Sequence, residues 1–167
     1  MKKRILFLCT DSVARSQMAE GAIVFKSKIQ NPKSKMKKRI LFLCTGNAAR
    51  SQMAEGLARA FYDDKIDVVS AGSRPSGFVH PNAIRALAEI GIDIKDAQSK
   101  SAEQFRNERF DVVVTVCDSA AADCPTWPGA KRIEHWSIED PSWSGYPAFV
   151  QTRDDLARRI EELVGAL

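Results

Sequence analysis

The chain begins with two nearly identical segments, and a single folded domain has room for only one of them. Residues 1–21 match residues 36–56 at 18 of 21 positions, and the three differences fall together in the middle of the segment. No third copy follows, so the repeat does not indicate a solenoid, which needs about three or more repeats. The duplication is better interpreted as a recent tandem event or a cloning artefact.

The duplication divides the chain into two expected parts. Residues 1–35 predict a non-catalytic N-terminal extension, which is a copy of residues 36–56 followed by the polar linker 31–35. Residues 36–167 predict the catalytic domain, because only the second copy leads directly into further strands and helices. We expect a monomer unless the extension mediates swapping between molecules.

Composition and charge exclude one class of partner. Apolar residues make up 44% of the 167 residues and charged residues 28%, which is typical of one soluble domain. The net charge of +4 arises in residues 1–35, which hold eight Lys and Arg residues and two Asp and Glu residues. Residues 36–167 hold 17 Lys and Arg residues and 19 Asp and Glu residues. The domain has no basic stripe with interleaved aromatic residues, so we expect no nucleic-acid partner.

The apolar runs and the cysteines indicate the compartment. No run approaches the roughly 20 apolar residues of a membrane span, so we expect no membrane partner. The run Ile5–Leu8 is shorter than the roughly 7–15 apolar residues of a secretory signal. The four cysteines do not build a disulfide framework. We therefore expect a cytoplasmic protein whose thiols stay reduced and take part in chemistry.

From Met36 onward, short apolar runs alternate with segments that have helical spacing. The expected strands cover residues 39–44, 66–70, 110–117 and 132–136, and the expected helices cover residues 50–62, 82–90 and 149–167. This alternation predicts an α/β domain with a parallel sheet. A ligand site in such a domain lies at the carboxyl ends of the strands.

The turn after the first strand of this domain reads CTGNAARS, from Cys44 to Ser51. Backbone N–H groups of such a turn, together with the N-terminus of the next helix, attract a tetrahedral oxyanion. Gly46 and Asn47 tolerate left-handed backbone, and Arg50 offers a planar fork for two oxyanion oxygens. We therefore expect Cys44 to be a nucleophile with a lowered pKa and a hydrogen bond from Ser51. The alternative is a buried structural cysteine beside a surface arginine.

The same turn resembles the phosphate-binding loop of the low-molecular-weight tyrosine phosphatases and of the arsenate reductases that share their fold. Further matching motifs cover nearly all of residues 36–167: Ser70-Ala-Gly, His80-Pro, Val114-Thr-Val-Cys-Asp, Cys124-Pro, His135-Trp and Asp140-Pro. The resemblance implies a three-layer α/β sandwich, in which helices flank a central, mostly parallel four-stranded sheet. It also implies that the substrate is bound by Thr45, Gly46, Asn47, Ala48, Ala49, Arg50 and Ser51.

The resemblance also implies a general acid, Asp140, which would protonate a departing oxygen. The alternative is an ordinary Asp-Pro turn. A phosphatase of this family tends to have tyrosines just after this Asp-Pro pair. Here Ser142 and Trp143 follow instead, which disfavours the phosphatase interpretation.

Two further cysteines, Cys117 and Cys124, separate the possible chemistries. Their spacing does not match a Cys-x-x-Cys motif, and the two histidines of the chain complete no zinc site with them. They are either buried structural cysteines or redox partners of Cys44, because reduction of arsenate to arsenite needs the two electrons that a thiol pair supplies. The pattern resembles the thioredoxin-coupled arsenate reductases, which implies that Cys117 attacks Cys44 and that Cys124 resolves their disulfide. The small and polar residues 118–123 predict a mobile segment.

The sequence therefore predicts an arsenate reductase of arsenic detoxification. Its expected substrate is arsenate, with phosphate or sulfate as analogues, and its expected reductant is thioredoxin or a similar dithiol protein. One alternative is a low-molecular-weight protein tyrosine phosphatase that hydrolyses phosphate monoesters through a phosphocysteine. Another is a non-enzymatic protein that binds an oxyanion or arsenite.

Some residues near the loop could bind a cation. Related reductases can bind potassium there, and Asn47 and Ser70 match two of the expected ligands. No carboxylate stands around Lys100, where a third ligand is expected, and Lys100 could supply the positive charge instead. We expect no metal, with a monovalent cation near Asn47 and Ser70 as the alternative. In the first copy, Asp11 would place a negative charge in the anion site, so Cys9 is expected to be inert.

Overall fold

The computed structural model describes residues 36–167, and the expectations for residues 1–35, Cys9 included, lie outside the described residues. The strands are β1 (Lys38–Cys44), β2 (Ile66–Gly72), β3 (Phe110–Thr115) and β4 (Ala130–His135). The helices are α2 (Arg50–Tyr62), α3 (Pro81–Ala88), α4 (Asp118–Asp123) and α5 (Tyr146–Gly165), with short 3-10 helices η1 (Ala102–Phe105) and η2 (Pro141–Trp143). None of the helices in this part of the chain is both long enough and apolar enough to cross a lipid bilayer.

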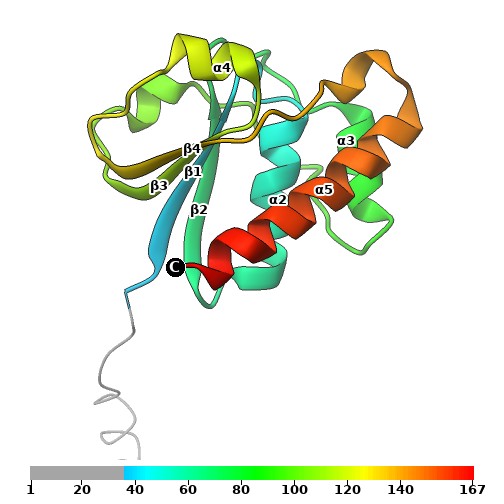
Figure 1. Ribbon diagram of the computed structural model, residues 1–167. Helices are drawn as coiled ribbons and strands as arrows, with labels where there is room; N and C mark the ends of the chain where they lie inside the picture. The colour runs from blue at the N-terminus through cyan, green and yellow to red at the C-terminus, as the bar shows by residue number, and fades with distance from the viewer. Residues whose placement is uncertain (1–35) are drawn as a thin grey trace, which may run out of the picture. The chain divides into compact units, whose positions relative to one another are not determined.

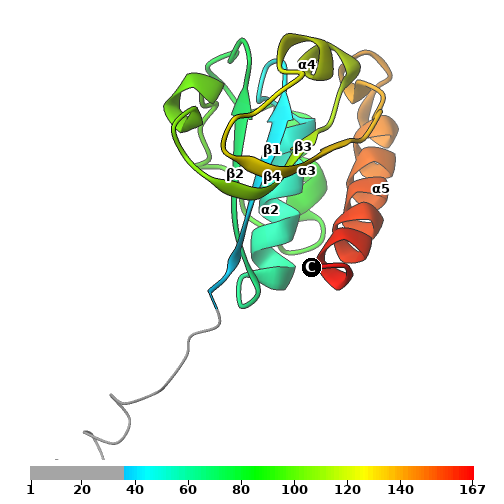
Figure 2. The same ribbon diagram turned by 60° about the vertical axis from the view of Figure 1, so that its left-hand side comes forward.

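The four strands form one parallel sheet in the order β2-β1-β3-β4. The register sets Cys44 opposite Gly72, Leu43 opposite Thr115, and Thr115 opposite His135. The carboxyl ends of all four strands therefore meet at one edge, and Figure 2 shows β1 in the middle of the sheet. Loops that leave this edge are the usual place for a ligand site in an open α/β sheet.

Both faces of the sheet are covered. Ile40 and Phe42 of β1 pack in a core with residues of α2, α3 and α5, whereas Leu41 and Leu43 pack on the opposite face with η1 and Trp127. Figure 1 shows α2, α3 and α5 together on one side of the sheet, and α4 across the carboxyl ends of the strands. Because side chains alternate across a strand, a strand buried on both faces consists of one uninterrupted apolar run. The arrangement confirms the predicted three-layer α/β fold, and its sheet is parallel throughout.

The segment between Cys117 and Cys124 forms a helix beyond those expected from the sequence. β3 ends at Thr115, and Cys117 takes extended backbone, with φ −156° and ψ 154°, as the N-cap of α4. Its sulfur accepts the N–H of Ala120 at 3.4 Å. Three consecutive alanines favour a helix, because alanine loses no side-chain entropy in one. The structure therefore shows a short helix at residues 118–123, and the mobility of this segment stays a prediction.

Candidate active site

The loop between β1 and α2 surrounds the sulfur of Cys44. Cys44 is the last residue of β1, and the residue is 3% exposed. Asn47 has a φ of 48°, the left-handed conformation that asparagine tolerates better than most residues. Its N–H donates to the sulfur at 3.0 Å, and the hydroxyl of Ser51, in the first turn of α2, lies 2.8 Å from the same sulfur. The structure thus places the sulfur between the loop and the helix N-terminus, at the carboxyl edge of the sheet.

Backbone bonds fasten the loop to the segment that follows β2. The N–H groups of Arg74, Ser76 and His80 donate to the carbonyls of Thr45, Gly46 and Ala48 at 2.9, 2.9 and 2.8 Å. A side chain at Gly72 would put its Cβ 2.6 Å from the Thr45 carbonyl oxygen, so only glycine lets β2 end this close to the loop. Ala49 is the N-cap of α2. The loop is therefore ordered by the domain itself, which lowers the entropy cost of binding a ligand there.

The side chain of Asn47 is fully buried and connects the loop to three other elements. Its amide nitrogen donates to the hydroxyls of Ser51 at 2.8 Å and Ser70 at 2.9 Å. Its oxygen accepts the side-chain N–H of Gln52 at 2.9 Å and the backbone N–H of Lys100 at 2.7 Å. Both donors and both lone pairs of the amide are used, so the side chain cannot turn without leaving a buried polar group unpaired.

A buried carboxylate, Glu55 on α2, extends this network, and the sequence reasoning missed it. Its side chain is 9% exposed and accepts hydrogen bonds from the Ser70 hydroxyl and, at 3.0 Å, from the ammonium of Lys100. Arg59 pairs with its other oxygen at 2.8 Å. Ser70, one of the two expected cation ligands, is therefore bonded to a carboxylate whose charge two cationic side chains already balance. A charged residue within a buried stretch of α2 was the signal that could have revealed Glu55.

Metal ligands are sparse in this part of the molecule. Within residues 36–167, no three His, Cys, Asp or Glu side chains lie close enough together to hold a metal ion. Around Asn47 and Ser70, the donor set consists of an amide, a hydroxyl and the Glu55 carboxylate, with the Lys100 ammonium against the carboxylate. The Lys100 ammonium thus pairs with the only carboxylate of this donor set among the described residues.

Burial governs the pKa of the Cys44 thiol. Desolvation raises this pKa above its usual range, while the hydrogen bonds from Ser51 and from the Asn47 N–H lower it by less, and the nearby Cys117 adds a further rise. The expectation of a lowered pKa is therefore wrong for this structure. The hydrogen bonds that would stabilise a thiolate are in place, but the sulfur is too deeply buried for them to prevail.

Arg50 and Asp140 face each other across the mouth of the loop. Arg50 donates to Asp140 at 2.8 Å and to the carbonyl of Ile138 at 2.9 Å. Burial raises the pKa of Asp140, but hydrogen bonds from Ser142 and the positive charge of Arg50 outweigh burial and leave the pKa below its usual range. The structure thus brings the predicted acid to the predicted oxyanion-binding arginine, with Asp140 in its ionised form.

Two of the three described cysteines adjoin the loop, and the third lies on the other face of the sheet. Cys117 is 4% exposed, and its sulfur lies 3.5 Å from the hydroxyl of Thr45. It shares a core cluster with Cys44, whereas Cys124 packs in the opposite cluster with Trp127. All three are free thiols in this structure. A second thiol therefore stands next to the candidate nucleophile.

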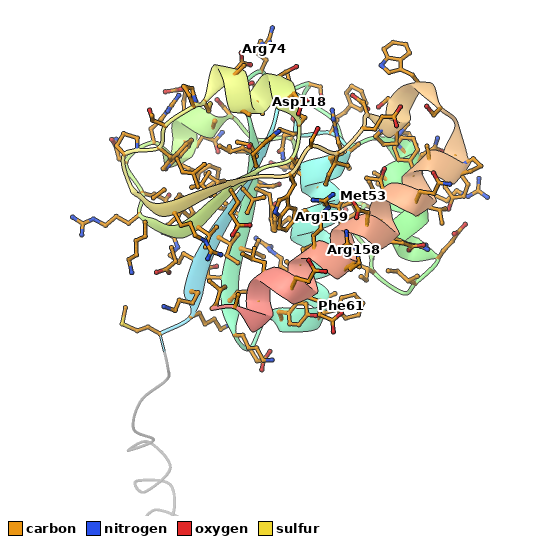
Figure 3. All side chains as sticks on the ribbon, viewed as in Figure 1. Met53, Phe61, Arg74, Asp118, Arg158 and Arg159 are labelled. Carbon is orange, nitrogen blue, oxygen red and sulfur yellow. The ribbon has the colours of Figure 1, made fainter. Side chains whose placement is uncertain are left out.

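Both ends of α4, the helix that joins these two cysteines, are fastened to neighbouring loops. At its start, Asp118 lies 2.9 Å from the Nε2 atom of His135. At its end, Asp123 accepts hydrogen bonds from Ser73 at 2.8 Å and from Arg74 at 3.1 Å. Figure 3 labels Asp118 and Arg74 beside α4, near the carboxyl edge of the sheet. The short helix is held by these attachments.

Comparison with known sequences gives a family and curated relatives. The family of low molecular weight phosphotyrosine protein phosphatases matches residues 39–167. An arsenate reductase of Halalkalibacterium halodurans is 43% identical over 166 residues, which cover 96% of this chain and 94% of that protein. An arsenate reductase of Bacillus anthracis is 43% identical over 160 residues, which cover 96% of this chain and 92% of that protein.

Solved structures agree with the sequence comparison. An arsenate reductase in its oxidized state aligns with a TM-score of 0.70 at 36% identity, covering 77% of this chain and 98% of that chain. A low molecular weight protein tyrosine phosphatase from T. tengcongensis aligns with a TM-score of 0.68 at 27% identity, covering 78% of this chain and 100% of that chain. The chain belongs to the low molecular weight phosphotyrosine protein phosphatase family.

Proposed function

We propose that this protein reduces arsenate to arsenite in arsenic detoxification, with Cys44 as the nucleophile and Cys117 and Cys124 as a disulfide relay. The observation that carries the proposal is the second thiol: the sulfur of Cys117 lies 3.5 Å from the Thr45 hydroxyl, inside the loop region of the nucleophile. Hydrolysis of a phosphate ester needs no second thiol, whereas a two-electron reduction does. The similarity to curated arsenate reductases at 43% identity supports the same activity.

The proposed reaction begins at the loop. Arsenate binds in the loop, held by backbone N–H groups and Arg50, and the Cys44 thiolate attacks arsenic. Asp140, which takes up a proton from water when the oxyanion displaces it from Arg50, gives this proton to the departing hydroxide, which leaves as water. Cys117 then attacks the Cys44 sulfur, so that the sulfur–arsenic bond breaks with its electron pair on arsenic and arsenite leaves. Cys124 attacks Cys117, which releases Cys44 as a thiolate.

The Cys117–Cys124 disulfide must then be reduced from outside. We assign this step to thioredoxin or a similar dithiol protein, since a dithiol supplies both electrons in one exchange. The cycle needs reduced thiols at its start, so we place the protein in the cytoplasm.

Substitution of the relay cysteines tests the proposed function. Cys117→Ser and Cys124→Ser are each expected to lower arsenate turnover, measured with thioredoxin as reductant, by at least about 100-fold, because each breaks the relay. Hydrolysis of an aryl phosphate by Cys44 should persist in both variants. Equal phosphatase activity in all forms with no arsenate turnover would identify a phosphatase, and stoichiometric oxyanion binding without turnover would identify a binding protein.

The pKa of Cys44 predicts how this thiol reacts with iodoacetamide. Because burial raises the pKa above its ordinary value of 9.0, the thiolate is scarce at neutral pH, and the alkylation rate should keep rising beyond that value. Saturating phosphate should protect Cys44, which peptide mass spectrometry identifies against a Cys44→Ser control. A rate that is already maximal at pH 7 would contradict the raised pKa.

The ammonium of Lys100 predicts that turnover does not depend on potassium. We propose that Lys100, 3.0 Å from Glu55, provides the positive charge beside Ser70 that a bound potassium ion would bring. Arsenate turnover should therefore be equal in potassium and sodium chloride of matched ionic strength. A stimulation of several-fold by potassium in the unaltered protein would contradict this role of Lys100.

The N-terminal copy is proposed to be dispensable for chemistry. Residues 36–167 hold every residue to which the reaction assigns a role, so a protein that starts at Met36 should keep full arsenate turnover. Cys9→Ser should be silent in the full chain, and both forms should elute as monomers on size exclusion. Loss of most activity in the shortened protein, with circular dichroism still that of a folded domain, would show that residues 1–35 belong to the working enzyme.

A further inference from the structure

The sulfur of Cys124 has a charged neighbour that the reaction does not yet use. Cys124 is 6% exposed and packs among apolar residues of the sheet face opposite Cys44. Arg106, which caps the end of η1, places its Nη2 atom 3.9 Å from this sulfur. One positive charge therefore contacts the thiol where the apolar cluster meets a hollow that is lined by charged residues.

Two further contacts hold Arg106 in this position. Its guanidinium lies over the ring of Trp127, 5.0 Å from the centroid, and its Nε donates to Glu103 at 3.1 Å. An arginine that stacks on an aromatic ring and pairs with a carboxylate loses much of its freedom before the reaction begins. The charge is thus set in place beside Cys124.

A second arginine at the same hollow provides a comparison. Arg74 and Arg106 both line the hollow into which Cys124 faces. Arg74 pairs with Asp123, and its side chain is 71% exposed, whereas the side chain of Arg106 is 34% exposed. Only Arg106 of the two has a contact with the sulfur in the described part of the chain. Loss of charge at Arg74 is therefore a matched control for loss of charge at Arg106.

We propose that Arg106 is a positioning residue for the last step of the relay, which itself rests on the proposed function. In that step, the Cys124 thiolate, its proton having passed to water, forms a bond to the Cys117 sulfur. The bond between Cys117 and Cys44 breaks, and its electron pair leaves with Cys44. One disulfide replaces another, so nothing is oxidised or reduced overall. Arg106 stabilises the negative charge on the attacking sulfur and holds that sulfur in the hollow until the attack.

The test is a single turnover of the full-length, fully reduced protein with one equivalent of arsenate and no external reductant. Arsenite release is followed by arsenic speciation, and disulfides are mapped by peptide mass spectrometry after acid quenching and alkylation. In the unaltered protein, the Cys44–Cys117 disulfide should form as arsenite is released and then give way to Cys117–Cys124.

Arg106→Met keeps the apolar stem and removes the charge. Arsenite release should keep its rate, while conversion of the first disulfide into the second should slow about tenfold, the scale of one lost charge-assisted hydrogen bond. Arg106→Lys should restore part of the rate, and it keeps the test valid if the Met variant does not fold. Arg74→Gln, which removes the charge but keeps a side-chain N–H donor for Asp123, should behave like the unaltered protein.

Conversion that is unchanged or faster in Arg106→Met would overturn the inference, because the contact would then be irrelevant or a restraint on Cys124. Slowing of equal size in Arg74→Gln would overturn it too, since that variant keeps a donor for Asp123 and the effect would then belong to the general charge of the hollow. Absence of arsenite release from the unaltered protein would overturn the proposed function itself, and the role of Arg106 with it.

Discussion

Asn47 is the residue on which the rest of the site depends. Its left-handed backbone turns an N–H toward the Cys44 sulfur, and its buried amide is bonded to Ser51, Ser70 and Gln52. Every polar atom of this amide is paired, so any other position of the side chain would leave a buried group unsatisfied, at a cost of about 1–3 kcal/mol. The core of the domain, more than the ligand, therefore fixes the shape of the loop.

The electrostatics of the loop depend on whether Arg50 is paired with Asp140 or with an oxyanion. Burial raises the pKa of Cys44, and the guanidinium of Arg50 is engaged with Asp140. In the proposed reaction, the oxyanion competes with Asp140 for Arg50. Once Asp140 loses that partner and faces a negatively charged substrate, its pKa rises, as a general acid requires. Binding of the substrate thus converts an ion-paired carboxylate into a proton donor.

The sequence was sufficient for the framework and insufficient for side chains that act through burial. Apolar runs predicted the first three strands, because strands covered on both faces need them, whereas the short and polar segment 132–136 corresponds to the largely exposed edge strand β4. The CTGNAARS turn located the candidate loop at the carboxyl edge of the sheet. The sequence did not predict the roles of Glu55 and Arg106. Their partners, Ser70 and Cys124, are distant in sequence, and no sequence pattern connects each residue with its partner. The pKa of Cys44 was predicted with the wrong sign, because desolvation depends on packing that no local motif encodes.

The proposed relay has to bring together thiols from the two faces of the sheet. The helix α4, which joins Cys117 to Cys124, is short enough to permit this movement. A helix of six residues is far below the roughly 12–15 that an isolated helix needs, so α4 depends on its cap and its attachments. The sulfur of Cys117 is that cap, since it accepts the N–H of Ala120. In the proposed relay, the bond from Cys117 to Cys44 would draw this sulfur away from α4, and loss of a side-chain N-cap costs a helix about 1 kcal/mol. The step that forms the first disulfide would therefore also destabilise the helix whose far end adjoins Cys124.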